Sequence, residues 1–281
     1  MKVQLMAFLV IGLLLCTPCK PANSCSPIDG VELVLGTPGV FIGDLHGTVE
    51  SPAFLAALAC HVVKSGKPLV VAMEYDATDQ SVLDQFLLSV DEAKAVSSLT
   101  STPHWTGNWD GRASGAMRDA LLTIRRLARA GGKVKLVAYD LWGDTSAERD
   151  KKSADLLRRV REDRGGAEFW IVFGGNVHAR KTKGLPFNNA PSGSDDFEPL
   201  GFLIRDWGLI HLDAGYRGGA AWACTGPSLD DCRIIDIGPG CTADCPAHPA
   251  IRLRTDDPAY DGVYEVGKLS VSAPLNRLRK N

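Results

Sequence analysis

Two apolar runs of the sequence lead into a Gly-x-x-His pattern, one ending at His46 and the other at His178. Carboxylates stand in comparable places: Asp44 lies inside the first pattern, and Glu74 and Asp140 each follow an apolar run. Imidazole and carboxylate groups together form the ligand set of a divalent metal, or a histidine base that acids orient. We therefore predict catalytic roles for His46, Glu74, His178 and Asp44, and a metal site formed by His46, Glu74, His178 and Asp140.

The apolar runs beside these residues are expected to be β-strands, and helical patterns separate them. The expected strands are 31–35, 40–42, 68–73, 134–139, 168–173, 200–205 and 209–212, with the last two as candidates for an antiparallel edge. The expected helices are 50–64, 81–99, 114–130 and 147–161.

Strands that alternate with helices in this way predict an α/β fold with a mostly parallel central sheet flanked by helices. Several strands are apolar at every position, which is typical of parallel strands covered on both faces. Because ligands bind beyond the carboxyl ends of such strands, the histidines and carboxylates are expected at one edge of one sheet. We expect residues 25–281 to form a single α/β domain.

Residues 1–24 have the features of a secretory signal peptide: one early lysine, an apolar run and a polar end. The run from Met6 to Cys16 is shorter than the ~20 apolar residues that a membrane span requires. We expect a secreted or periplasmic protein without a membrane span; a lipid anchor on Cys25, directly after the leader, is the alternative. The 281 residues include 31 Lys+Arg and 33 Asp+Glu, so a nucleic-acid partner is not expected.

Six cysteines remain after the leader, and in an oxidising compartment an even number favours disulfides. Four of them lie in the Gly- and Pro-rich segment 219–250, which we expect to be a disulfide-rich insertion. The expected pairs are Cys25–Cys60, Cys224–Cys232 and Cys241–Cys245. A zinc site formed by the last four is the alternative, although their spacing departs from the paired C-x2-C pattern of zinc sites.

Other residues are candidates for contact with a substrate. Arg180 or Arg149 would stabilise an oxyanion, and His104 and Tyr75 would line the cleft. The segment 186–199 is either a lid or a tolerated surface insertion. The sequence contains no G-x-S-x-G, H-E-x-x-H or P-loop motif, so it lacks the signatures of a serine hydrolase, a zincin or a nucleotide-phosphate site.

The ordered combination GDLHGT, an apolar strand ending at Glu74, and GGNVHARK resembles the Tiki, erythromycin-esterase and ChaN-type superfamily. The stretch DGRASGAM at 110–117, the triplet ERD at 148–150 and the tail from YDGV at 260–263 to SAP at 272–274 are also similar to that group. The resemblance covers about residues 31–275. It implies an α/β unit built from two related halves. The chain departs from two branches at Asp44, where Glu is usual, and the insertion 219–250 is not a feature that the resemblance accounts for.

Members of this superfamily differ in function. The resemblance to Tiki-like proteins implies a metal-dependent peptidase, that to erythromycin esterases implies ester hydrolysis by a His and Glu constellation, and that to ChaN-type proteins implies haem binding. We expect a secreted or periplasmic hydrolase of a peptide or ester bond, assisted by a divalent metal such as Mn, Co or Zn. The alternative is a non-enzymatic haem-binding protein whose contacts include Tyr75, His104 or Trp105. The sequence does not indicate an oligomeric state.

Overall fold

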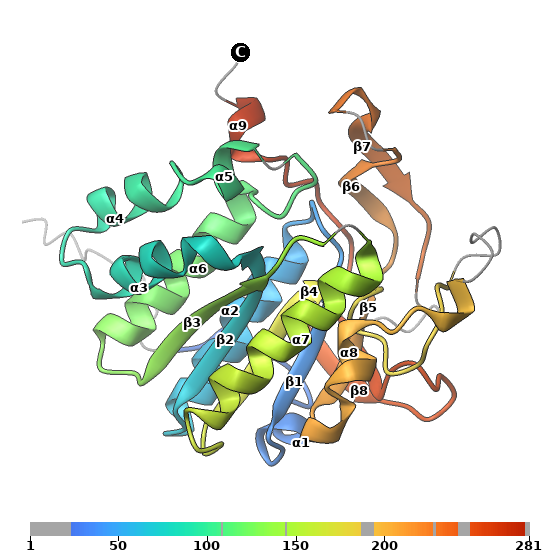
Figure 1. Cartoon of the computed structure of the whole chain (residues 1–281), viewed down its shortest axis with the longest axis horizontal. Helices are drawn as coiled ribbons and strands as arrows, with labels where there is room; N and C mark the ends of the chain where they lie inside the picture. Colours follow the sequence, from blue (N-terminus) through green and yellow to red (C-terminus); the bar gives the residue numbers. More distant parts are fainter. Residues whose placement is uncertain are drawn as a thin grey trace, which may run out of the picture.

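A seven-stranded sheet lies at the centre of the computed structural model, with strand order β3-β2-β4-β1-β5-β9-β8 (Figure 1). The structure describes residues 24–107, 109–143, 145–186, 194–226, 229–240 and 248–278. Neighbouring strands are parallel except for the antiparallel pair β8 and β9. The strands are β1 Gly39–Asp44, β2 Leu69–Asp76, β3 Val134–Asp140, β4 Phe169–Gly175, β5 Ile210–Gly215, β8 Ala250–Leu253 and β9 Gly262–Glu265.

Helices cover both faces of this sheet. Alternate residues of β1 enter opposite cores: Val40 and Ile42 pack in the core with α2, α3 and α6, and Phe41 packs in the core with α7 and α8. Burial on both faces explains why the central strands are apolar at every position. The helices are α1 Glu32–Leu35, α2 Glu50–Lys64, α3 Gln80–Leu88, α4 Glu92–Leu99, α5 Pro103–Gly107, α6 Gly115–Arg129, α7 Ser146–Glu162, α8 Leu200–Leu203 and α9 Leu275–Leu278.

The predicted α/β class with a mostly parallel sheet is confirmed, but several elements differ from the sequence prediction. Residues 31–35, expected as a strand, contain the helical turn α1, which buries Val34 and leaves Glu32 more exposed. Residues 200–205 form α8 and a 3-10 turn, and the following strand β5 lies inside the sheet, parallel to β1. Tertiary packing therefore overrode β-propensity in both short segments.

Two further differences concern breaks and edges. The single helical stretch expected over 81–99 is divided into α3 and α4, because Asp91 caps α4 and the Arg125 guanidinium binds carbonyls at the end of α3 and the carbonyl of Ser89 after it. The antiparallel edge of the sheet is the pair β8 and β9, which the sequence did not indicate.

Two of the three expected disulfides are present. Cys25–Cys60 ties the start of the described chain to α2. Cys224–Cys232 joins the two strands of a separate antiparallel hairpin, β6 Gly219–Cys224 and β7 Cys232–Ile237. Because two of the four clustered cysteines are bonded to each other, the four-cysteine zinc alternative is wrong. Cys241 and Cys245 lie outside the described residues, as does the leader up to residue 23.

The helices of the described part of the chain are all too short or too polar to cross a membrane.

The register of the parallel strands brings the chemically interesting residues to one edge. Asp44 lies opposite Gly175, at the carboxyl ends of β1 and β4. Glu74 lies in β2 just beyond the pair Met73 and Phe173, and Asp140 ends β3. The expected meeting of these strand ends therefore occurs, and it sets the position of the site.

Candidate active site

Gly175 leaves a space at the centre of the site. A Cβ atom built at Gly175 would lie 3.2 Å from His46 Nε2, 3.4 Å from His178 Cδ2 and 3.7 Å from Glu74 Oε2. The two Gly-x-x-His patterns thus bring their histidines to one place, with Glu74 between them. The absence of a side chain at residue 175 is what allows the two rings and the carboxylate to approach one another.

His46 is braced by Asp44. The Nδ1 atom of His46 lies 2.6 Å from Asp44 Oδ2, and its Nε2 atom lies 3.7 Å from Glu74 Oε2. Burial by itself would lower the pKa of His46, but the charge and hydrogen bond of Asp44, with the charge of Glu74, raise it to about 9. The Nδ1–H bond to Asp44 fixes the ring and leaves Nε2 facing the space beside Gly175.

His178 has a similar brace, which the sequence analysis missed. Its Nδ1 atom lies 2.8 Å from Asp150 Oδ2, and the same oxygen accepts a hydrogen bond from the Leu200 backbone N–H at 2.9 Å. Burial opposes the charged ring, yet the Asp150 hydrogen bond and the charges of Glu74 and Asp150 raise the pKa of His178 above its usual value. Each of the two histidines therefore forms an imidazole–carboxylate pair, His46 with Asp44 and His178 with Asp150.

Glu74 is held as an ionised carboxylate. Its Oε1 atom lies 3.0 Å from Arg112 Nη1 and 2.6 Å from Arg149 Nη2, and its Oε2 atom accepts the Gly175 N–H at 2.7 Å. Burial alone would raise the pKa of Glu74, but the two guanidinium groups and the two histidines hold it well below its usual range. The carboxylate therefore links the arginines on one side to the imidazoles on the other.

Asp140 contacts arginine rather than facing the histidines. Arg149 Nε donates to Asp140 Oδ1 at 2.6 Å and Arg149 Nη2 to Oδ2 at 2.7 Å, which is a bidentate pair. Arg112 Nη1 is 3.2 Å from the same Oδ2 atom. Both carboxylate oxygens of Asp140 are therefore occupied by cations of the protein.

This arrangement does not fit the predicted metal site. A divalent ion would compete with two guanidinium groups for Glu74 and Asp140, and Asp140 has no oxygen left for it. Among the described residues, no group of three or more His, Cys, Asp or Glu side chains is placed to hold a metal. The metal-ligand roles of His46, Glu74, His178 and Asp140 remain predictions that these contacts do not support.

Local structure explains how the two arginines reach the site. The side chain of Thr145 accepts the Glu148 backbone N–H and caps α7, so Arg149 and Asp150 stand within the first two turns of that helix. Arg112 lies in the loop before α6, where Asp110 accepts from its backbone N–H and from Nε. One loop and one helix end thus supply both cations and the brace of the second histidine.

The other predicted contact residues lie around this centre. Tyr75 and His104 are both buried, and their rings are in tilted contact with centroids 3.8 Å apart. Neither Tyr75 Oη nor His104 Nε2 has a hydrogen-bond partner among the described residues. Burial, aided by the Arg112 charge, lowers the pKa of His104 to about 3, so the ring is neutral. Arg180 donates to Thr182 Oγ1, outside the Glu74 network.

Neither Tyr75 nor His104 is accessible to a haem, because both side chains are buried and their rings contact each other. The haem alternative stays a prediction that no contact among the described residues supports. Of the segment 186–199, expected to be a lid or a surface insertion, residues 187–193 lie outside the described chain. Near its far end, Phe197 packs edge-on against His178 at 6.4 Å between centroids.

The geometry can be compared with known proteins. No family model matches the chain. Among solved structures it is similar to a mutant of the erythromycin esterase EreC in its open conformation, with 12% identity over 85% of this chain and 94% of that one, and a TM-score of 0.61. A Bacillus cereus protein matches at 12% identity over 84% of this chain and 89% of that one, with a TM-score of 0.50. The chain therefore shares its fold with the erythromycin esterase EreC and with the Bacillus cereus protein, in agreement with the fold that the resemblance implied.

ChaN of Campylobacter jejuni, whose structure describes cofacial haem binding, has 12% identity over 74% of this chain and 89% of that one, with a TM-score of 0.42.

The structure shows what lies at the two places where the sequence departs from the pattern of the resemblance. Asp44, shorter than the usual Glu, reaches His46 Nδ1 directly, and the strands β6 and β7 within the segment 219–250 form a disulfide-bonded hairpin. Arg112 and Asp150 lie within motifs that carried the resemblance, although their spacing alone gave no sign of their partners.

Proposed function

We propose that the protein hydrolyses carboxylic ester bonds with two aspartate-braced histidines, without a step that requires a metal. The observation that carries this proposal is the convergence of His46 Nε2, His178 and Glu74 on the space beside Gly175. The fold that the chain shares with an erythromycin esterase supports the choice of an ester among acyl substrates.

In the first step, neutral His46 accepts a proton from water at Nε2, and the hydroxide adds to the ester carbonyl carbon. Asp44 holds Nδ1–H and stabilises the imidazolium that forms, because its carboxylate lies 2.6 Å from that nitrogen. Glu74, 3.7 Å from Nε2, adds a second negative charge beside the same ring.

The oxyanion that forms requires a nearby cation. Arg149 uses Nε and Nη2 to hold Asp140 and Glu74, and its Nη1 makes no hydrogen bond among the described residues. We assign Nη1 of Arg149 to the oxyanion, in agreement with the role that the sequence suggested for this residue. Arg112 uses all three of its nitrogens on Asp110, Glu74 and Asp140, so it supports the network instead.

In the second step, the carbon–oxygen bond to the alcohol breaks, and His178 gives its proton to the leaving alkoxide. Asp150 and Glu74, against the opposing effect of burial, raise the pKa of His178 above its usual value and so favour the protonated ring that this step requires. One water is consumed and an acid and an alcohol are released. Proton transfer between the two rings through solvent restores the starting state.

We infer an oxidising compartment for this activity, in agreement with the secreted or periplasmic location expected from the leader. Two disulfides among the described residues support the inference, since such bonds persist mainly outside the cytosol.

The test is hydrolysis of a panel of uncharged esters and peptides by the mature protein and by His46→Gln and His178→Gln. His61→Gln is the matched control, because His61 lies on α2, where its Nε2 is 2.9 Å from the Ser26 carbonyl oxygen. We expect ester hydrolysis by the protein and the control, and a loss of at least about 100-fold in kcat/KM in each site variant. Full activity in both folded site variants would overturn the site assignment, and cleavage of peptides alone would replace the ester with a peptide bond.

A further inference from the structure

A pocket of about 410 Å³ opens directly beside the charged network. Arg112 and Asp140 belong to its wall and also to the set of contacts around Glu74, so the pocket adjoins the candidate site. The volume is within the range of small-molecule sites. The rest of the wall is formed by Asp76, Pro103, His104, Gly107, Trp109, Asp110 and Trp142.

Two exposed indoles distinguish this wall from an ordinary surface. Trp142 is 65% exposed and Trp109 is 40% exposed, although large apolar side chains are mostly buried elsewhere in the described chain. The Arg149 guanidinium lies 5.4 Å from the ring centroid of Trp142, so this indole already has one cation on its face. Trp faces are the aromatic surfaces that attract cations most strongly.

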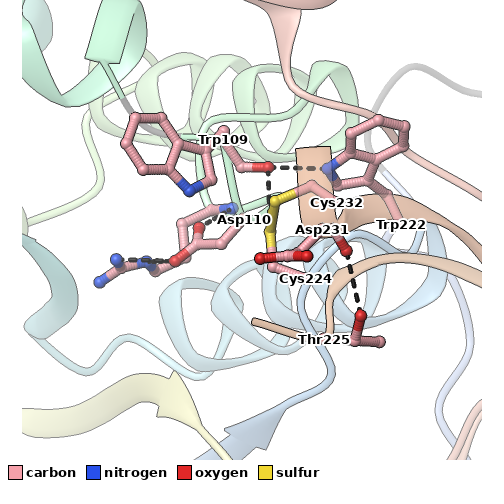
Figure 2. Close-up of a disulfide and its surroundings, with 8 residues drawn as sticks. Trp109, Asp110, Trp222, Cys224, Thr225, Asp231 and Cys232 are labelled. Atoms are coloured by element: carbon pink, nitrogen blue, oxygen red, sulfur yellow. Dashed lines mark hydrogen bonds and ion pairs between the residues drawn. A yellow bond between two sulfur atoms is a disulfide. The ribbon is translucent and has the colours of Figure 1, made fainter. Parts of the chain in front are cut away.

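The Trp109 wall is held in place by the disulfide hairpin (Figure 2). The Trp109 carbonyl accepts a hydrogen bond of 2.7 Å from Trp222 Nε1 in β6, and Cys224 Sγ lies 3.7 Å from the same oxygen. The Trp222 backbone N–H in turn donates to the Gly47 carbonyl, next to His46, at 3.1 Å. The insertion that the fold does not otherwise require therefore connects the pocket wall to the catalytic loop.

The charges that line the pocket favour a cationic ligand. Three carboxylates and one guanidinium line the pocket, and Arg112 is already paired with Asp110 and Asp140. Asp76 forms no ion pair within the described chain, where Thr78 donates two hydrogen bonds to its Oδ1 atom. His104, buried and neutral, adds no positive charge and keeps an unpartnered Nε2.

We propose that this pocket binds an organic ammonium group of the substrate, which lies against Trp109 and Trp142 with Asp76 as its counter-charge. The proposal rests on the proposed function, and it names the substrate class as esters that carry an alkylammonium group a few bonds from the carbonyl. An indole pair with an unpaired carboxylate binds such a cation by cation–π attraction and by charge.

The test compares two esters of equal shape, acetylcholine and its uncharged isostere 3,3-dimethylbutyl acetate. Each kcat/KM is divided by the rate constant for hydroxide hydrolysis of the same ester, which removes the difference in intrinsic reactivity. We expect the charged ester to be preferred by about tenfold or more, and expect Asp76→Asn and Trp142→Leu each to reduce the preference several-fold. The control is Asp119→Asn, the same change on the exposed face of α6, which we expect to leave the preference for the charged ester unchanged.

Binding is measured separately, so that failure of the two proposals can be distinguished. Tetramethylammonium chloride is titrated into the protein and followed by tryptophan fluorescence, with sodium chloride as the salt control. Saturable quenching that Asp76→Asn and Trp142→Leu weaken supports the ammonium site even if no ester is hydrolysed. Hydrolysis of both esters at equal corrected rates, or fluorescence unchanged by the cation, would overturn it while leaving the proposed hydrolysis to its own test.

Discussion

The pairing of His46 with Asp44 leads to a quantitative expectation for the pH dependence of hydrolysis. Burial alone would lower the pKa of His46, but Asp44 and Glu74 raise it from 6.5 to about 9. At pH 7 only about one molecule in a hundred then has the neutral ring that accepts a proton from water. We therefore expect kcat/KM for an uncharged ester to rise with pH, by about tenfold per unit, toward a plateau near pH 9 that ends where His178 loses the proton that it gives to the leaving alkoxide.

Asp44→Asn removes the charge that causes most of this rise, while burial continues to favour the neutral ring. The inflection in kcat/KM is expected to move down by about two pH units, and the plateau to fall on the order of 10³–10⁴, because an amide does not fix the required tautomer. The assays are steady-state kinetics from pH 5 to 10 and a titration of the ¹⁵N-labelled His46 ring by NMR.

The same pair predicts how stability changes with pH. Since the pKa of His46 is higher in the folded than in the unfolded protein, its stabilisation is fully present below pH 6.5 and is lost as the pH rises through about 9. The difference between the folded and unfolded pKa values of His46 corresponds to about 3 kcal/mol of unfolding free energy at most. The measurement is urea unfolding below pH 6.5 and above pH 9. A His46 pKa below 7 in the unaltered protein, or one that Asp44→Asn leaves unchanged, would refute the reasoning.

Other expectations follow from single contacts. Gly175→Ala places a Cβ 3.2 Å from His46 Nε2, so kcat/KM should fall about tenfold or more while circular dichroism stays unchanged. Arg149→Gln leaves the buried Glu74 with one guanidinium partner fewer, and urea unfolding should show a loss of about 3–5 kcal/mol. Cys60→Ser opens a disulfide of sequence separation 35 and should cost about 4 kcal/mol of stability while the ester-hydrolysis rate at 25 °C is retained.

The fold was predictable to the extent that it depends on long apolar runs. Strands β2, β3 and β4 are buried along most of their length, and such runs are distinctive because few other elements are apolar at successive positions. Short segments were less predictable. Residues 31–35 and 200–205 contain enough apolar residues for a strand, but their helical turns are set by what they pack against.

The site was predictable where residues stand at strand ends. Asp44, Glu74 and Asp140 come together because parallel strands end at the same edge, which sequence order alone indicates. Arg112 and Asp150 were not assigned roles, since a loop and a helix start bring them in from positions whose direction the sequence does not define. The sequence also did not indicate that Arg112 and Arg149 pair with Glu74 and Asp140, and the metal site remains a prediction.

The most direct test of this account is the rate of ester hydrolysis by protein that has been depleted of metal by chelation and checked by elemental analysis. Because Glu74 and Asp140 are neutralised by Arg112 and Arg149, we expect the depleted protein to keep its full rate, and His46→Gln to lose it under the same conditions. Activity that disappears with the metal and returns when stoichiometric Mn, Co or Zn is added would contradict the account.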